Sequence, residues 1–311
     1  MLRHYTKHSP GEKFRQVHTP ETEGVWTHAE QPSDDELDQV VKMHQLDANI
    51  ISDLRDAYEL PRVEYSQKAL YVFLRAAQRT KHGEVISMPV LAVIAPNAYI
   101  TLTSTNSVAE GKIIDALHRD ARSDDKGALL LSTFAAITAD YEALIHRTGR
   151  YIKDIGRRLR THEVNNADFV HFVTIEDNLN EYHSNLAGMH AVADRLKENA
   201  HGIFSQRDCE ALDDLTLYID QLTTAVSSHS QSVTSIRNAY STIANNTLNM
   251  RMKTLTVLTV LIALPNVFYG MYGMNVPLPF EKEPWAYGAI VLFTVLLIFL
   301  VYSLAKRFRV F

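Results

Sequence analysis

The sequence predicts an α+β membrane protein, with an N-terminal mixed α/β cytoplasmic domain, a long helical stalk and two C-terminal transmembrane helices. Two uncharged apolar segments, 254–274 and 286–305, are long enough to cross a membrane. No proline occurs in residues 97–264, which favours long helices there. We therefore divide the chain into a cytoplasmic α/β domain (1–125), a cytoplasmic stalk domain (126–250) and a two-span domain (251–311) with a short external loop (275–285).

Four short segments of the first domain predict strands, because they are apolar and rich in β-branched or aromatic residues. Pro89 lies in one of them. Proline cannot donate to a sheet ladder, so we expect an edge strand or an interrupted strand there. With helices between them, these strands predict a mixed sheet with helices on its faces. The segments are 24–30, 69–77, 84–95 and 98–105.

Helices are expected around these strands. Ser33 and Glu36 have the spacing of a capping box, which predicts a helix over 35–46. The segments 49–60 and 108–123 also read as helices. Residues 126–199 predict two long helices with a turn near the polar segment 161–168.

The next helix is expected to begin near Gln206 and to continue into the first span, because no stop signal intervenes. Its apolar-rich positions alternate in steps of three and four, which is typical of a helix packed on other helices. These positions are Leu212, Leu215, Ile219, Leu222, Val226, His229, Val233, Ile236, Tyr240, Ile243, Thr247 and Met250.

Charge and composition exclude several classes of protein. Residues 1–250 carry 25 Lys and Arg against 34 Asp and Glu, and this acidic body argues against a nucleic-acid partner. Cys209 is the only cysteine, so an internal disulfide or a thiolate metal cluster is excluded. No phosphate-binding loop and no nucleophile–base spacing is present, so we expect neither an enzyme nor an organic cofactor. The N-terminus has no signal-peptide pattern.

Flanking charges predict the orientation of the two spans in the bilayer of the cell (inner or plasma) membrane. Arg251 and Lys253 precede the first span, and Lys306, Arg307 and Arg309 follow the second. The positive-inside rule then places both termini in the cytoplasm and loop 275–285 outside.

The first span is more polar than the second, with three threonines, Asn266, Gly270 and Gly273. An asparagine inside a membrane is costly unless it faces protein or water. We therefore expect one side of the first span to face water. One such helix per chain cannot enclose a pore, so a pore would need a symmetric ring of copies.

Tyr272-Gly273-Met274-Asn275 ends the first span, and only a short loop and one more span follow it. This arrangement resembles the CorA family of divalent-cation channels. The resemblance extends over essentially the whole chain, through the segments 25–37, 60–77 and 97–104 and the junction Asn249-x-x-Met252-Lys253.

The resemblance implies a funnel-shaped homopentamer in which five first spans line one pore. Gly273, Met274 and Asn275 would form the external selectivity filter, with the amide of Asn275 and the carbonyl of Gly273 meeting a hydrated Mg²⁺. Mg²⁺ dehydrates reluctantly, and neutral oxygens can hold its waters without stripping them. The transported ion would be Mg²⁺, and Co²⁺ or Ni²⁺ as well.

The resemblance also implies which residues line and gate the pore. Met252 and Leu255 resemble the hydrophobic constriction of the family, and Asn266 stands where members commonly have threonine. Whether Leu255 or Thr256 faces the pore stays open. The full set expected to line the pore is Asn249, Met252, Leu255 or Thr256, Thr259, Ala263, Asn266 and Gly270.

Gating in the family implies a second role for Mg²⁺, as a cytoplasmic regulator that holds the channel closed. Asp213 and Asp214 fall where a regulatory aspartate lies, and counting back from Asn275 favours Asp214. The partner carboxylate would come from the α/β domain of a neighbour, but residues 75–85 are poor in acids. In the external loop, Glu281 and Glu283 could attract cations.

Two alternatives remain open. One is a Zn²⁺ transporter on the same scaffold, which the intact Met274 disfavours. The other is a membrane metal sensor that does not conduct, which the polar residues of the first span disfavour.

Overall fold

The computed structural model describes residues 2–9, 12–17, 24–104, 122–160, 166–274 and 283–307. The chain forms two compact units, Met1–Thr234 and Ser235–Phe311, which we treat separately. Helix α6 (Gln206–Tyr272) begins in the first unit and ends in the second, as the absence of stop signals predicts. The division at residues 125 and 250 stays a prediction.

The first unit contains a seven-stranded sheet in the order β2-β1-β3-β7-β6-β5-β4. β3 and β7 pair in parallel and the other neighbours pair antiparallel, so the predicted mixed sheet is confirmed. The four predicted strands correspond to β3, β5, β6 and β7, and the sequence reading missed β1, β2 and β4. The bounds are β1 Leu2–Thr6, β2 Arg15–Val17, β3 Val25–Glu30, β4 Arg62–Ser66, β5 Ala69–Arg79, β6 Val85–Ile94 and β7 Ala98–Thr103.

The expectation for Pro89 was wrong, because β6 is an uninterrupted inner strand between β5 and β7. Pro89 lies opposite Arg75 of β5, and the β6–β7 ladder begins one residue later at Val90 and Thr103. The carbonyl of Pro89 accepts a hydrogen bond from the Ser104 hydroxyl (3.2 Å) on the β7 side. The nitrogen and the carbonyl of a strand residue point to the same side, so the nitrogen of Pro89 also faces β7. The β6–β7 ladder ends at this point, and the N–H that Pro89 lacks is therefore not needed for it.

One face of the sheet is covered by α1 (Asp34–His44), α2 (Ala48–Ser52) and the 3₁₀ turn η1 (Asp53–Arg55). The capping box is confirmed: Glu36 N donates to Ser33 Oγ (3.3 Å) and Ser33 N donates to Glu36 Oε2 (3.0 Å). Leu37 and Val40 of α1 join Ile51 and sheet residues in one buried core.

The helix expected over 49–60 is only partly present, because α2 and η1 end at Arg55. The carboxylate of Asp56 accepts a hydrogen bond from Tyr58 N (2.8 Å), a local turn that competes with helix. Pro61 also disfavours helical conformation in the residue before it.

Arg62, at the start of β4, holds several neighbouring segments together. It pairs with Asp53 (2.6 Å), Glu59 and Glu64, and its guanidinium lies 4.3 Å from the centre of the Phe73 ring. One side chain thus ties η1 and the following loop to β4 and β5.

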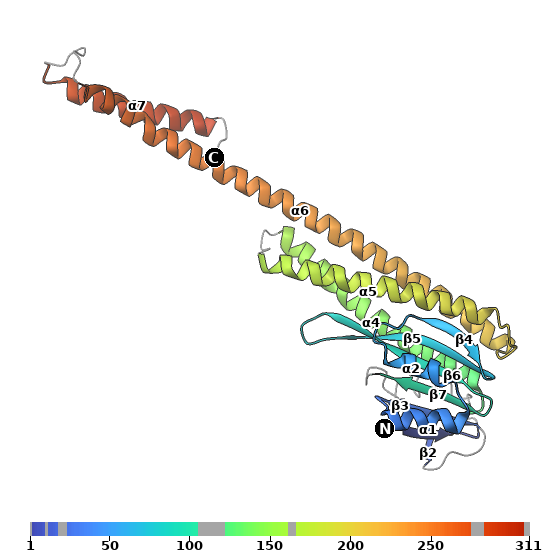
Figure 1. Ribbon diagram of the computed structural model, residues 1–311. Coiled ribbons are helices and arrows are strands. Elements are labelled where there is room, and N and C mark those ends of the chain that lie inside the picture. The colour runs from blue at the N-terminus through green and yellow to red at the C-terminus, as the bar shows by residue number, and fades with distance from the viewer. Residues whose placement is uncertain are drawn as a thin grey trace. The chain divides into compact units, whose positions relative to one another are not determined.

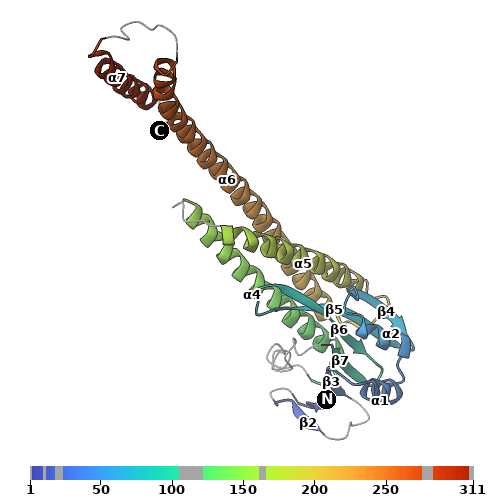
Figure 2. The same cartoon turned by 60° about the vertical axis from the view of Figure 1, so that its left-hand side comes forward.

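The other face of the sheet is covered by α4 (Lys126–Arg160), and α5 (Asn166–Lys197) contacts β4, β5 and β6 (Figures 1 and 2). These are the two long helices that the sequence predicts. Tyr99 Oη donates to Thr133 Oγ1 (2.7 Å), and Tyr141 Oη donates to the carbonyl of Arg75 (3.1 Å).

α4 is long and apolar enough to cross a membrane, but half of its most apolar 18-residue segment is buried in this unit. Most of the expected helix 108–123 and the core of the turn near 161–168 lie outside the described residues.

The first part of α6 packs within the same unit. Its residues Leu212, Ile219, Val226 and Val233 are buried, which confirms that the first half of the apolar stripe packs on other elements. His190 of α5 lies 3.1 Å from Asp220 of α6.

In the second unit, the remainder of α6 and α7 (Ala286–Arg307) are both long and apolar enough to cross a membrane, as predicted. The ring of Phe268 packs edge-on against Phe293, with centroids 5.2 Å apart. Tyr269 Oη lies 3.4 Å from Thr294 Oγ1.

Candidate functional site

The membrane half of α6 has two different faces. A half-buried stripe consists of Val257, Leu261, Leu264, Pro265 and Phe268, and Phe268 packs against Phe293 of α7. At about 100° per residue, the centre of the expected pore-lining set lies roughly 160° away from the centre of this stripe. α7 therefore leaves the expected pore face uncovered, and Met252, Leu255, Thr256, Thr259, Ala263, Asn266 and Gly270 are all exposed in the single chain.

Threonine hydroxyls on this part of α6 are held by the helix itself. Thr256 Oγ1 donates to the carbonyl of Met252 (2.9 Å), and Thr259 Oγ1 donates to that of Leu255 (2.8 Å). Each hydroxyl proton is thereby used, while the oxygen keeps lone pairs that can accept hydrogen bonds from water. This face can therefore present acceptors to a hydrated cation. Leu255 and Thr256 are both exposed, so the choice between them stays open.

The signature at the end of α6 is described as far as Met274. Gly273 N donates to the carbonyls of Tyr269 (3.0 Å) and Gly270 (3.2 Å), and Met274 N donates to that of Met271 (3.2 Å). The helix thus tightens in its final turn. Met274 is exposed. Asn275 and Glu281 lie outside the described residues.

Asn249 and Glu283 stand at the two ends of the expected pathway. Asn249 is exposed on α6, before the first span. Glu283 is exposed, and its carbonyl accepts from the N–H of Ala286, the first residue of α7 (3.1 Å).

The two candidate regulatory aspartates have different surroundings. Asp213 Oδ1 lies 3.0 Å from Lys197 Nζ, which compensates its charge within the chain. Asp214 is exposed and forms no ion pair with any described residue. Within the described ranges, no group of three or more His, Cys, Asp or Glu side chains is placed to hold a metal ion. A metal site at Asp214 would therefore need ligands from elsewhere.

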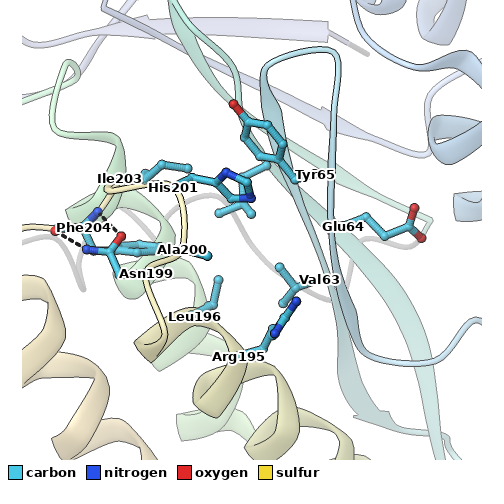
Figure 3. A pocket seen from close by; sticks show the side chains of 11 residues that line it. Val63, Glu64, Tyr65, Arg195, Leu196, Asn199, Ala200, His201, Ile203 and Phe204 are labelled. Atoms are coloured by element: carbon cyan, nitrogen blue, oxygen red, sulfur yellow. Dashed lines mark hydrogen bonds between the residues drawn. The ribbon is translucent and has the colours of Figure 1, made fainter.

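A small hollow of about 70 Å³ lies between β4 and the segment that joins α5 to α6 (Figure 3). The rings of Tyr65 and His201 stack across it, 3.7 Å apart. The side chain of Asn199 accepts from Phe204 N (3.0 Å) and donates to Phe204 O (2.8 Å). Ligand sites are usually about 300–1,000 Å³, so these contacts fix the loop rather than form a binding site.

The sequence reading missed a larger groove, of about 530 Å³, between α4, α5 and the β5–β6 turn. Its basic lining could have been noticed from the arginines of the segment 147–160, which stand out against the acidic body.

Comparisons with known proteins identify a family and several structures that resemble this chain. The model of the "CorA-like Mg2+ transporter protein" family matches residues 21–307. The "Cobalt/magnesium transport protein CorA" of Methanocaldococcus jannaschii is 22% identical over 288 residues, which cover 91% of this chain and 90% of the relative.

Solved structures share the fold. The complete structure of the CorA magnesium transporter from Methanocaldococcus jannaschii superposes with a TM-score of 0.84 at 19% identity, over 99% of this chain and 98% of that one. The full-length CmaX protein gives a TM-score of 0.73 at 17% identity, over 96% of this chain and 97% of that one. The ZntB cytoplasmic domain from Vibrio parahaemolyticus gives 0.62 at 14% identity, over 78% of this chain and 98% of that one.

Proposed function

The chain belongs to the CorA-like Mg²⁺ transporter family, and on that premise we propose that it is a passive Mg²⁺ uptake channel that also admits Co²⁺ or Ni²⁺. Family membership makes it a membrane protein that transports ions and not an enzyme. The observation that carries the proposal is the uncovered polar face of α6, which runs toward Gly273 and Met274 on the side away from α7.

The conducting assembly in this proposal is a funnel-shaped homopentamer in the cell membrane, with both termini in the cytoplasm. A single α6 cannot enclose a pore, whereas copies related by rotation can turn the same face toward one axis. α7 then lies between α6 and the lipid, which suits its continuous apolar sequence.

Selection of the ion is assigned to Gly273, Met274 and Asn275. A ring of neutral oxygens can accept hydrogen bonds from the waters around Mg²⁺ and leave the inner shell in place. A ring of carboxylates would bind the ion more tightly and slow its release. Glu283 and Glu281 would raise the local cation concentration at the mouth.

Below the mouth, the hydrated ion passes Gly270, Asn266, Ala263 and Thr259. Met252 and Leu255 form the apolar constriction, which closes the pore by excluding water. Asn249 lies just before it, at the cytoplasmic entrance.

Regulation is assigned to Asp214, with Asp213 secondary because Lys197 already pairs with it. Cytoplasmic Mg²⁺ bound here would have to favour the closed state, since a ligand shifts an equilibrium only by its differential affinity for the two states. The other ligands would come from a neighbouring subunit.

The first test is Mg²⁺ flux into proteoliposomes whose internal Mg²⁺ is either chelated or millimolar. We expect flux only with low internal Mg²⁺. Flux at both levels would support the channel and contradict the regulatory role of Asp214. Zn²⁺ flux without Mg²⁺ flux, or no flux of either ion, would overturn the proposal in favour of a Zn²⁺ transporter or a sensor.

The selectivity assignment has its own test. We expect Asn275→Ala to abolish Mg²⁺ flux while the assembled oligomer persists, because the ring loses its amide oxygens. Asn49→Ala makes the same chemical change on the exposed surface of α2 and should leave flux unchanged. Wild-type flux in Asn275→Ala would remove Asn275 from the filter.

A further inference from the structure

The groove of about 530 Å³ in the first unit is lined by basic side chains from two helices, one strand and one turn. Arg147 and Arg150 come from α4, Arg79 comes from β5, and His82 and His171 come from the β5–β6 turn and α5. Among the described residues, Asp154 is the single acidic side chain in the lining.

The positive charge of this groove is not balanced within the described chain. Arg147 and Arg150 are exposed and form no ion pair with any described residue. Arg79 Nε donates to the carbonyl of Gly83 (3.3 Å), an uncharged partner. Asp154 is already shared by two arginines outside the lining, Arg157 (3.0 Å) and Arg158 (3.4 Å). The groove therefore carries an excess of guanidinium groups that face solvent.

The walls of the groove are held in place by hydrogen bonds of one buried side chain. The side chain of Asn178, on α5, accepts from Val85 N (2.7 Å) and donates to the carbonyl of Gly83 (3.0 Å). These bonds fix the β5–β6 turn against α5. The rings of Tyr151 and His171 meet edge-on, with centroids 6.0 Å apart, and supply an aromatic surface beside the arginines.

An ordinary structural cause does not account for these cations. Lys and Arg are favourable in the last turn of a helix, because they interact with its dipole. That explains Arg157 and Arg158, close to the end of α4 at Arg160. Arg147 and Arg150 lie two or more turns earlier, and Arg79 is on a strand. Three arginines from two elements converge here without a carboxylate of their own.

We propose that this groove binds a phosphate-bearing anion of the size of a nucleotide. The planar guanidinium pairs with phosphate oxygens in a bidentate geometry, which favours phosphate over a simple halide. The volume lies within the range of about 300–1,000 Å³ of small-molecule sites. Tyr151 offers a face for the non-phosphate part. The proposal does not depend on ion conduction, so it can fail while the transport function stands.

The test is equilibrium binding to the full-length protein in detergent, with ATP and inorganic pyrophosphate as probes. EDTA is present throughout, so that binding of Mg²⁺ to the nucleotide does not contribute. We expect saturable binding by the wild type. The double variant Arg147→Gln/Arg150→Gln should bind at least about tenfold more weakly, because each lost charge-assisted hydrogen bond is worth about 1.5–3 kcal/mol.

A matched control removes the same number of charges elsewhere. Lys153→Gln/Arg207→Gln changes two exposed cations outside the groove lining and should bind within about twofold of wild type, as expected for screened surface charges. The single variant Arg150→Gln gives a second reading if the double variant unfolds, and thermal melts without ligand check folding.

Each outcome decides the proposal. Equal binding of pyrophosphate and ATP supports a site that recognises the phosphate groups alone, whereas tighter ATP binding supports a contact with the nucleoside as well. The absence of saturable binding of both probes overturns it. So does equal weakening in the groove and control variants, because binding would then reflect overall charge.

Discussion

Gly188 of α5 lies against Pro61, the residue just before β4. A Cβ atom at this position would be 2.8 Å from Cγ of Pro61 and 3.1 Å from its Cδ. The proline ring cannot rotate away, because it is closed on the backbone. Close packing between a helix and a rigid ring therefore requires glycine here.

We predict that Gly188→Ala destabilises the protein. Overpacking typically costs about 1–3 kcal/mol, and the better helix propensity of alanine recovers about 1 kcal/mol. The net loss should be about 1 kcal/mol in a denaturant titration. The control Ser184→Ala, on the exposed side of α5, should be neutral or slightly stabilising. Equal stability of the two variants would show that this contact relaxes without cost.

For the candidate pore residues, helix periodicity determines which positions share a face and says nothing about what covers it. Met252, Thr259 and Asn266 are spaced seven residues apart, which puts them on one face of a helix. Their position opposite Phe268 depends on where α7 packs, which is a tertiary contact. Likewise, counting back from Asn275 favours Asp214 over Asp213, but the ion pair between Asp213 and Lys197 is a tertiary contact that no spacing contains.

At the scale of elements, most of the fold could be predicted because its signals are local. The capping box at Ser33, the proline-free helices and the apolar strands depend on neighbours in sequence. The errors came from non-local geometry. Pro89 is tolerated inside β6 because β7 ends beside it, and no pattern within β6 contains that information.

The first unit also contains two histidines that make its stability depend on pH, His28 on β3 and His44 at the end of α1. His28 is buried, and the Thr101 hydroxyl lies 2.7 Å from its Nδ1. Burial, with the nearby charge of Arg3 second, lowers the pKa of His28 to about 4. Burial also lowers the pKa of His44 to about 4, with the charge of His4 second. Both rings are therefore neutral in the folded state at pH 5, while an unfolded chain would bind protons there.

We predict that this unit loses stability as pH falls from about 6.5 to about 4. Between these values the unfolded state binds more protons than the folded state, so stability rises with pH. For His28 alone the loss is at most about 3 kcal/mol. Denaturant titrations at several pH values measure it. The stability of His28→Gln should depend less on pH than that of the wild type. An unchanged slope in His28→Gln would contradict the assignment.

At the scale of the whole molecule, the apolar stripe of α6 continues past the part that the first unit buries. Its later positions keep the alternating steps of three and four, but none of them is buried in the single chain: Ile236, Tyr240, Ile243, Thr247 and Met250. A sustained stripe of this kind is the contact surface of a helix bundle. Other copies of α6 are the partners that the proposed ring supplies, and they would also close the pore around Asn266.

We therefore predict that contacts along this stripe hold five copies of the chain together and that the pore forms in the same assembly. Native mass spectrometry of the detergent-solubilised protein should give five copies of the 35.2 kDa chain, about 176 kDa. Ile243→Asp should yield smaller species and abolish Mg²⁺ flux, because a carboxylate buried in a helical seam costs several kcal/mol per copy. Ser241→Asp adds the same charge at an exposed position off the stripe and should leave the mass unchanged.

A wild-type mass other than five copies would contradict the pentamer. An unchanged mass for Ile243→Asp would instead show that the contacts holding the ring together lie elsewhere than on this stripe.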